Sequence, residues 1–158
     1  MNENDKKAAL LMIPYGLYVV GVTDGTSVSA FTANWLSQCS FTPPLIMMGV
    51  KKDSRAHALL DKGRVFSVNM LGGEHKNVAA FFFRGPEAEE SRFGNYAFEQ
   101  GEGGVPLLTD APASVECRVT GFYPHGDHSV VVGEVIGATL RREAKPLTME
   151  STGWKYGG

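Results

Sequence analysis

The sequence predicts a mainly β protein: a closed or nearly closed antiparallel barrel that carries a few short helices. Strand-like segments outnumber helical ones, and we count about six of them. Asp24-Gly25 separates two segments rich in β-branched and aromatic residues, which is a strong hairpin signal. A second pair of strand-like segments is joined only by the short turn 124–127, so these two strands must also be antiparallel.

Composition and charge are those of an ordinary globular domain. The 158 residues are 43% hydrophobic and 20% charged, which predicts a single domain over residues 1–158. A net charge of −2 argues against a nucleic-acid surface, which needs clustered Lys and Arg. Cys39 and Cys117 form no C-x-x-C motif, MNENDKK has no signal-peptide pattern, and the apolar segment 8–22 is too short for a membrane helix. We therefore expect a soluble cytoplasmic protein without a membrane or nucleic-acid partner.

The first third of the chain predicts one short helix and one hairpin. Asp5–Ile13 has an acidic start, strong helix formers and a proline directly after it. Leu17–Thr23 and Ser27–Ala33 are the two expected hairpin strands. A polar turn over 34–38 opens the loop that follows, and Pro43-Pro44 ends it, because neither proline has an N–H group to give a sheet.

The middle of the chain alternates between strands and helices. Leu45–Val50 is continuously apolar, which predicts a strand buried on both faces. Ser54–Lys62 predicts a two-turn helix ended by Gly63 in the C′ position. Arg64–Leu71 alternates as a strand does. His75–Arg84 is expected to be helical and largely covered, because it carries three consecutive phenylalanines.

Two further strands are expected near the C-terminal end. Ser114–Tyr123 alternates cleanly, and its inward residues are Val115, Cys117 and Val119. His128–Leu140 is the next strand, with Gly133 and Gly137 as candidate bulges or bends.

Two segments show no regular pattern. Gly85–Gly104 is rich in Gly, Glu, Arg and Asn and predicts a long surface loop, a feature that is uncommon unless it is functional. The end of the chain, 153–158, places Trp154 and Tyr156 in a polar context, so we expect it to dock on another part of the protein.

Residues 51–57 have the composition of an anion site. Two lysines follow the apolar strand, Asp53 or Ser54 stands in the helix N-cap position, and Arg55 comes next. The free N–H groups and the dipole of a helix N-terminus both favour an anion. On these residues alone, a capped surface helix with solvated cations is the more common interpretation, and a phosphate site is the alternative.

Several common catalytic motifs are absent from the sequence. It contains neither G-x-G-x-x-G nor a P-loop, and it lacks G-x-S-x-G and H-E-x-x-H. His125 and His128 have a spacing that metals use, but they lie in a turn with no third ligand in prospect. We therefore predict no metal site.

Four motifs together resemble one known family. They are T-A-N-W-L-S-Q-C-S-F-x-P-P-L-I-M-M-x-V at 32–50, K-x-x-S-R-A at 51–56, GRVFSVNML at 63–71, and G-D-H with G-E-V at 126–128 and 133–135. In order and spacing the chain resembles the flavin reductase-like, FMN-binding split-barrel family over roughly residues 8–140. It is most similar to the flavin reductase module of flavodiiron proteins. The resemblance implies a six-stranded antiparallel Greek-key split barrel, whereas composition alone leaves an α+β sandwich open.

The resemblance also implies a set of site residues. Those expected to hold the flavin ring, largely through backbone groups, are Thr32, Ala33, Asn34, Ser37, Gln38 and Cys39. Those expected at the phosphate are Lys51, Ser54, Arg55 and His57. Trp35 is expected either to cover the ring or to pack in the barrel wall, and Cys39 to be a buried small residue instead of a nucleophile. His128 is expected near the nicotinamide, as the residue important for turnover; a strand-start histidine bonded to a neighbouring loop is the alternative.

The function implied is NAD(P)H-dependent reduction of flavin, with electrons passed to a free flavin or a protein acceptor. We expect FMN rather than FAD, because the phosphate cluster is compact and no dinucleotide fingerprint is present. NADH or NADPH is the expected donor, and a homodimer is the expected assembly. Two alternatives stay open: a non-catalytic FMN-holding electron carrier or sensor, and a split barrel for another ligand such as heme. The region of His128 and the loop Gly85–Gly104 discriminate between reductase and carrier, because a reductase must admit a nicotinamide there.

Overall fold

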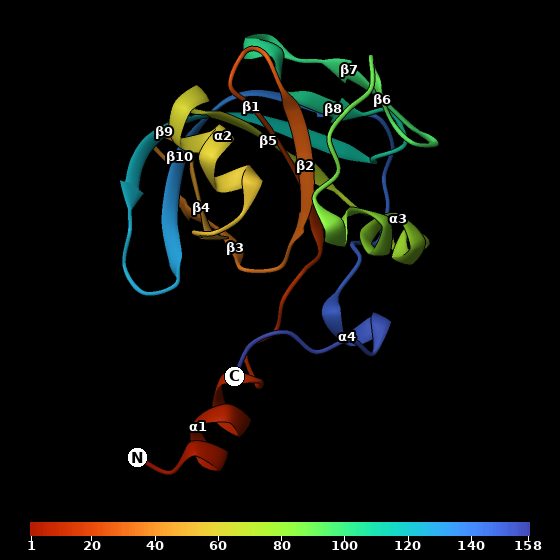
Figure 1. Ribbon diagram of the computed structural model, residues 1–158. Helices are drawn as coiled ribbons and strands as arrows, with labels where there is room; N and C mark the ends of the chain where they lie inside the picture. The colour runs from red at the N-terminus through yellow and green to blue at the C-terminus, as the bar shows by residue number, and fades with distance from the viewer.

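The computed structural model describes all residues, 1–158, and its centre is one curled antiparallel sheet (Figure 1). Its strands are β1 (Tyr18–Thr23), β2 (Val28–Ala33), β3 (Leu36–Ser40), β4 (Leu45–Lys51), β5 (Val65–Met70), β9 (Ala113–Tyr123) and β10 (His128–Leu140). They follow in the order β2-β1-β5-β9-β10-β4-β3, and each neighbouring pair is antiparallel. The strands β2 and β3 at the two edges are joined directly through Asn34 and Trp35, so the sheet curls back on itself.

The predicted mainly β antiparallel barrel is confirmed, with both predicted hairpins present. The sheet has seven strands instead of six, because Leu36–Ser40, predicted within a loop, pairs with β4. The interpretation of Leu45–Val50 as buried on both faces is wrong. Ile46, Met48 and Val50 point into the core, whereas Met47 is 42% exposed on the outer face. The continuous apolar run is therefore a strand with only one buried face.

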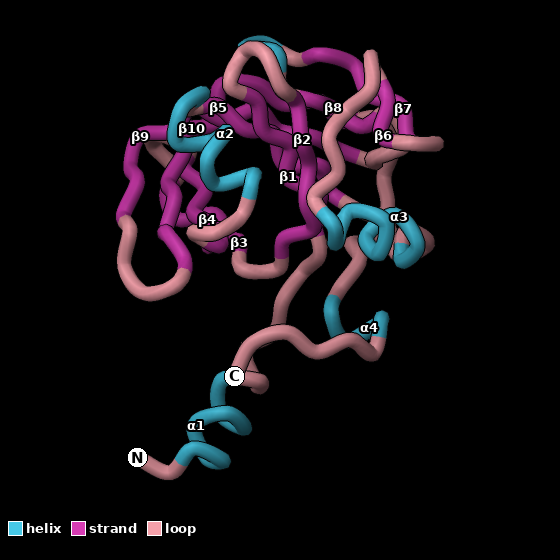
Figure 2. The backbone as a smooth tube through the Cα atoms, in the orientation of Figure 1, coloured by secondary structure: helices cyan, strands magenta, loops and turns pink.

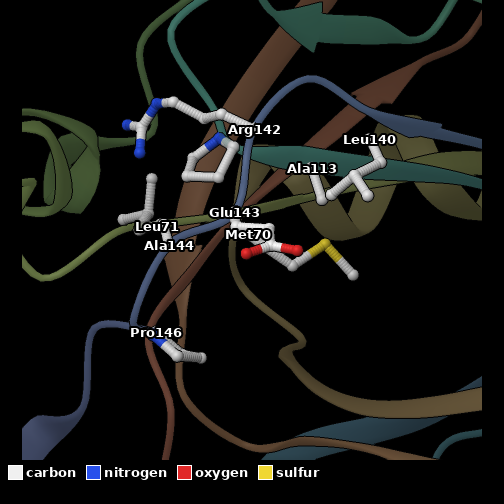
Figure 3. A pocket seen from close by; sticks show the side chains of 9 residues that line it. Met70, Leu71, Ala113, Leu140, Arg142, Glu143, Ala144 and Pro146 are labelled. Carbon is white, nitrogen blue, oxygen red and sulfur yellow. The ribbon is translucent and has the colours of Figure 1, made fainter.

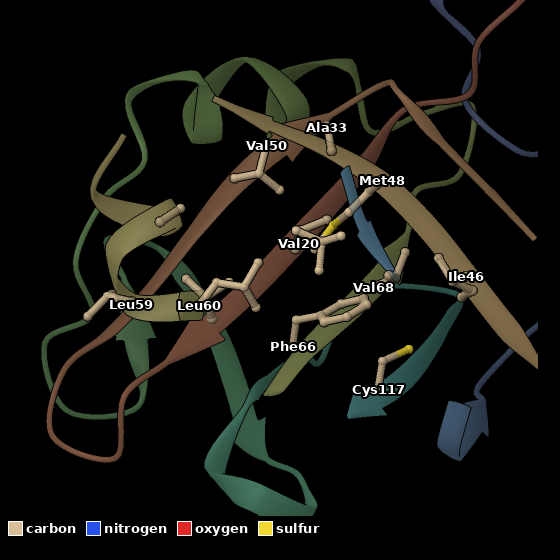
Figure 4. Close-up of a cluster of buried hydrophobic side chains, with 13 residues drawn as sticks. Val20, Ala33, Ile46, Met48, Val50, Leu59, Leu60, Phe66, Val68 and Cys117 are labelled. Atoms are coloured by element: carbon tan, nitrogen blue, oxygen red, sulfur yellow. The ribbon is translucent and has the colours of Figure 1, made fainter. Parts of the chain in front are cut away.

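The barrel interior is a single apolar cluster, of which Figure 4 shows the central part. Phe66 of β5 lies fully buried in it, next to Gly133 of β10. A Cβ atom on Gly133 would lie 2.4 Å from the Phe66 ring, so only glycine fits there. The pairing of β9 with β10 shifts register at Gly133 and again at Gly137, which confirms both predicted bulges.

The segment Gly85–Gly104, predicted as an irregular surface loop, contains regular structure. A small antiparallel sheet packs beside the barrel and consists of β6 (Arg92–Phe93), β7 (Tyr96–Gln100) and β8 (Pro106–Leu108). The fully buried Asn69 of β5 joins it to the barrel. The Asn69 side chain accepts from Leu108 N–H and the Ser114 hydroxyl, each at 2.8 Å, and donates to Val19 O at 3.1 Å. The loop prediction failed because Phe93 and Phe98 are buried against partners distant in sequence.

The helices lie outside the barrel, as the tube view in Figure 2 also shows. They are α1 (Glu3–Leu10), α2 (Arg55–Gly63), α3 (Lys76–Phe81) and α4 (Met149–Thr152), with 3-10 turns η1 (Phe82–Arg84) and η2 (Glu102–Gly104). The helix α1 buries none of its residues and projects away from the barrel (Figure 1). No helix of the protein has both the length and the apolarity required to cross a membrane.

The end of α2 differs from the prediction in one residue. Gly63 is the last helical residue, and Arg64, not Gly63, adopts the left-handed conformation, with φ of 59°. A Cβ atom on Gly63 would lie 1.8 Å from the carbonyl oxygen of Thr23. The glycine is therefore required by the close packing of α2 on the β1–β2 hairpin and not by the helix cap.

Candidate functional site

A cavity of about 650 Å³ opens at one end of the barrel, between α2, η1 and residues 153–158, which we call the tail. The ends of β2 and β4 and the start of β10 complete its wall. Eight of the twelve predicted site residues line it: Thr32, Ala33, Asn34, Trp35, Lys51, Ser54, Arg55 and His128. These eight residues come from three separate parts of the sequence and meet at a single cavity.

A second, smaller cavity of about 470 Å³ lies where β5 and the start of β9 meet the segment that follows β10 (Figure 3). Met70, Leu71 and Leu140 contribute its apolar wall. None of the predicted site residues lines it. Arg142 at its edge forms an ion pair with Glu74, so this cation already has a partner.

The N-terminus of α2 faces the larger cavity. Ser54 is the N-cap: its hydroxyl accepts from His57 N–H at 3.1 Å and donates to Lys51 O at 2.7 Å. The first N–H groups of the helix, on Arg55 and Ala56, have no acceptor within the helix. Arg55 forms an ion pair with Glu87 at 2.5 Å. The helix therefore presents free N–H groups, its positive dipole end and nearby cations to the same space, which is an environment suited to an anion.

His128 is held in place from three sides. Its Nδ1 atom lies 2.8 Å from a carboxylate oxygen of Asp127, and this hydrogen bond holds the pKa of the Asp127 carboxyl below its usual range. A carboxylate only accepts hydrogen bonds, so Nδ1 carries the proton and, in the neutral ring, Nε2 offers a lone pair. The Tyr156 hydroxyl lies 3.4 Å from Nε2, and the Trp35 ring centroid lies 4.8 Å from that of His128.

Four predicted site residues lie away from the cavity. Ser37, Gln38 and Cys39 are exposed on the edge strand β3, where the Gln38 amide donates to Ser40 O at 3.2 Å. The expectation that Cys39 is buried is wrong, because β3 has no layer covering this side. His57 is half-buried on α2; its Nε2 lies 2.7 Å from the Ser129 hydroxyl, and its ring meets the edge of Phe122.

The tail contributes residues that the sequence did not assign to the site. Trp154, Lys155 and Tyr156 all line the cavity, and so do Phe83 and Arg84 of η1. The expectation that the aromatic tail docks on the protein is confirmed. The segment His75–Arg84 was expected to be largely covered; Phe82 is fully buried, but Phe83 is 57% exposed. The unexplained aromatics of the tail were the only sequence signal for this side of the site.

The residues present fit a flat ligand that carries a phosphate. The volume of the cavity lies within the range of about 300–1,000 Å³ typical of small-molecule sites. Ala33 and Gly49 line part of its wall without a bulky side chain. A Cβ atom on Gly49 would lie 3.1 Å from the Trp35 indole. Small residues let a planar ring approach the backbone closely. The α2 end supplies the anion-binding part of the same cavity.

The curled antiparallel barrel with a ligand-sized cavity at its end defines a split-barrel protein. The chain belongs to the flavin reductase-like family, because the family described as "Flavin reductase like domain" matches residues 10–156. This result confirms the family suggested by the four sequence motifs.

The chain matches a small part of some relatives and most of the length of others. Diflavin flavoprotein A 1 of Synechocystis is 31% identical over 92% of this chain, but the chain spans only 26% of that protein. The FMN reductase (NADH) SmoA of Agrobacterium fabrum is 29% identical over 92% of this chain and 81% of its own length. The structure of the NADH:FAD oxidoreductase SgcE6 of Streptomyces globisporus, in complex with NAD and FAD fragments, is 30% identical with a TM-score of 0.78; the match covers 89% of this chain and 83% of that one.

Proposed function

We propose that the chain is an NAD(P)H-dependent flavin reductase that holds FMN in the larger cavity. The observation that carries the proposal is the meeting of the α2 N-terminus and the Asp127-oriented imidazole of His128 on one cavity wall. Relatives that match most of the chain support it, since one is named an FMN reductase and another an NADH:FAD oxidoreductase.

The anion-binding end would hold the phosphate. Arg55 and Lys51 supply charge, and the first N–H groups of α2 supply hydrogen bonds. Ser54 was expected to contact the phosphate directly. Its hydroxyl instead caps the helix and donates to Lys51 O, so we do not propose it as a direct ligand. Its contribution would be to hold these N–H groups in position.

The ring of the flavin would lie along the wall formed by Thr32, Ala33 and Asn34. The Thr32 hydroxyl donates to Ala79 O at 2.6 Å and is therefore committed to the fold. The backbone groups of this segment, rather than its side chains, would recognise the ring. Ser37, Gln38, Cys39 and His57 have no place in this proposal, because they do not line the cavity.

His128 would orient the nicotinamide. Because Asp127 fixes the proton on Nδ1, the Nε2 lone pair would accept a hydrogen bond from the carboxamide N–H₂ group of the donor, in place of the Tyr156 hydroxyl that lies 3.4 Å from it. Trp35 and Tyr156 bound the space around this imidazole: the Trp35 ring contacts both the His128 ring and the Tyr156 ring. Bound flavin supplies the redox chemistry by accepting hydride from the reduced nicotinamide.

A homodimer and a reducing cytoplasmic location are part of the proposal. The outer face of the sheet exposes Met47 of β4 and Val130 of β10, and Phe41 projects from the β3–β4 turn. These apolar side chains need cover, and a second copy would supply it. Cys39 and Cys117 are both free, as expected in a reducing compartment. Sedimentation equilibrium at micromolar concentration tests the dimer; a monomer alone would contradict it.

Visible spectroscopy tests the reductase function directly. The protein, saturated with FMN under anaerobic conditions, should lose its flavin absorption on addition of NADH or NADPH, faster than free FMN does. If FMN binds but neither nucleotide bleaches it, the chain is an electron carrier that uses a protein acceptor or donor. If FMN does not bind at all, the proposal as a whole is wrong.

A further inference from the structure

We propose that Tyr156 is a gating residue of the nicotinamide site: its side chain occupies the place of the donor ring and has to move away before the donor binds. The inference rests on the proposed function, because it concerns the space beside the same imidazole. It adds to that function a second position of the tail and a residue that sets the affinity for the donor.

The Tyr156 side chain lies directly beside the polar atom that would recognise the donor. Its hydroxyl is 3.4 Å from His128 Nε2, and its ring lies against the Trp35 indole, with 5.3 Å between centroids. Because Nδ1 of the neutral ring carries the proton, Nε2 has one lone pair and accepts one hydrogen bond. The phenol and the carboxamide of a nicotinamide therefore exclude each other at this atom.

The start of the tail is anchored firmly on the protein. Trp154 N–H donates to the Thr152 hydroxyl at 3.1 Å. The Trp154 ring meets the Phe83 ring nearly edge to face, with 4.9 Å between centroids, and Lys76 Nζ lies 5.2 Å from the centre of the indole. These contacts fix Trp154 against α3, η1 and α4, so any movement of the tail begins after this residue.

Tyr156 itself is held weakly. Residues 155–158 form no backbone–backbone hydrogen bond. The carbonyl oxygen of Tyr156 accepts from the Asn34 amide at 3.4 Å; this contact and the one to Nε2 are both longer than the usual hydrogen-bond range of about 2.7–3.2 Å. The side chain is 50% exposed, so its movement uncovers little apolar surface. A segment anchored at one end and weakly held at the other can exchange between two positions while the barrel stays intact.

Competition by Tyr156 has a consequence that no other role of this side chain shares. The observed affinity for the donor is the intrinsic affinity reduced by the fraction of molecules in which the site is open. An aromatic contact and a weak hydrogen bond favour the closed tail by roughly 5- to 30-fold. Removal of the side chain should therefore strengthen nicotinamide binding. A wall residue that packs on the nicotinamide would weaken binding when removed, and a purely structural residue would leave it unchanged.

Equilibrium dialysis of oxidised nicotinamide mononucleotide measures this effect. The mononucleotide carries the nicotinamide ring and cannot donate hydride, so binding is measured without turnover, on protein saturated with FMN. Y156A should bind it roughly 5- to 30-fold more tightly than wild type. Y156F keeps the ring and loses only the hydroxyl, so its gain should be smaller. Y123A is the matched control, because Tyr123 is 52% exposed and does not line the cavity.

Fluorine NMR tests the displacement itself. Incorporation of 3-fluorotyrosine labels all five tyrosines, and the signal that is missing from Y156F belongs to Tyr156. Addition of the mononucleotide should move this signal toward the position of free fluorotyrosine. A Tyr156 signal that does not move while the mononucleotide binds would overturn the proposal, because the ring would then have stayed in place.

The dialysis result separates this inference from the proposed function. Thermal melts first confirm that each variant is folded. Equal or weaker binding of the mononucleotide to Y156A than to wild type would overturn the gating role, and the binding to wild type would leave the proposed function standing. Absence of binding to both proteins would overturn the two proposals together.

Discussion

The imidazole of His128 lies against the indole of Trp35, with 4.8 Å between the ring centroids and 55° between the ring planes. Trp35 comes from the short connection between β2 and β3, and its indole also packs on Gly49 of β4. The sequence left two roles open for Trp35, and the structure places it in the wall beside His128. The aromatic contact and the hydrogen bond to Asp127 together leave the imidazole little freedom to rotate.

Replacement of His128 by Ala should slow anaerobic flavin reduction about 10- to 1,000-fold while leaving FMN bound, because an orienting contact to the donor is lost. Stopped-flow absorbance of the bound flavin measures the rate, and a thermal melt measures stability. His125→Ala is the matched control, since His125 lies exposed in the same turn. A lower melting temperature with an unchanged rate per bound FMN would assign His128 a structural role only.

Replacement of Arg55 by Ala should weaken FMN binding by about 1.5–3 kcal/mol, the usual contribution of a hydrogen bond to a charged group. Equilibrium dialysis measures the affinity. Lys52→Ala removes a cation of the same segment that does not line the cavity, and it should leave the affinity unchanged. Glu87→Gln should not weaken FMN binding, because it frees Arg55 from its ion pair. Equal affinities of R55A and wild type would move the phosphate elsewhere.

Glu116 should make the protein less stable as the pH rises. Burial raises the pKa of its carboxyl, so the folded state disfavours the charged form relative to the unfolded chain. The penalty is absent at low pH, grows as the pH passes the ordinary carboxyl pKa, and is complete above the raised one. Glu116→Gln should therefore raise the melting temperature at pH 7 and change it little near pH 3. The exposed Glu143→Gln is the control; a pH-independent effect of E116Q would contradict the assignment.

Replacement of Gly133 by Ala should destabilise the barrel by about 1–3 kcal/mol, the typical cost of overpacking a core. The added methyl group would lie 2.4 Å from the ring of Phe66, which is fully buried and cannot move aside. Urea denaturation measures the change in free energy of unfolding. Gly73→Ala is the control, since the nearest atom to its Cβ position is 3.8 Å away. Equal stability of G133A and wild type would show that Phe66 has room to shift.

The parts of the fold that were predictable are those with local signals. Asp24-Gly25 marked the first hairpin, and the turn before His128 marked the second. The strand β3 was missed because Ser37 and Gln38 face solvent, so the segment has no apolar alternation. The small sheet β6–β8 was missed because its buried residues pack on partners far away in the sequence.

The same limit applies to the candidate site. The α2 end was predictable, because an N-cap residue and cations occur within one short segment. The contacts of Tyr156 with Trp35 and His128 were not, because they join residues more than twenty positions apart through tertiary packing. Ser37, Gln38 and Cys39 were assigned to the ring by their place in a motif, but they are exposed on the edge strand β3 and do not line the cavity.

The buried amide of Asn69 has a consequence for how the protein loses its structure. Because it bonds to β1, β8 and β9 at once, the small sheet cannot detach without leaving polar groups unpaired in the interior of the barrel. The two sheets should therefore open as one cooperative unit. The amide hydrogen of Leu108 should exchange with solvent as slowly as those at the centre of β5, although β8 is only three residues long.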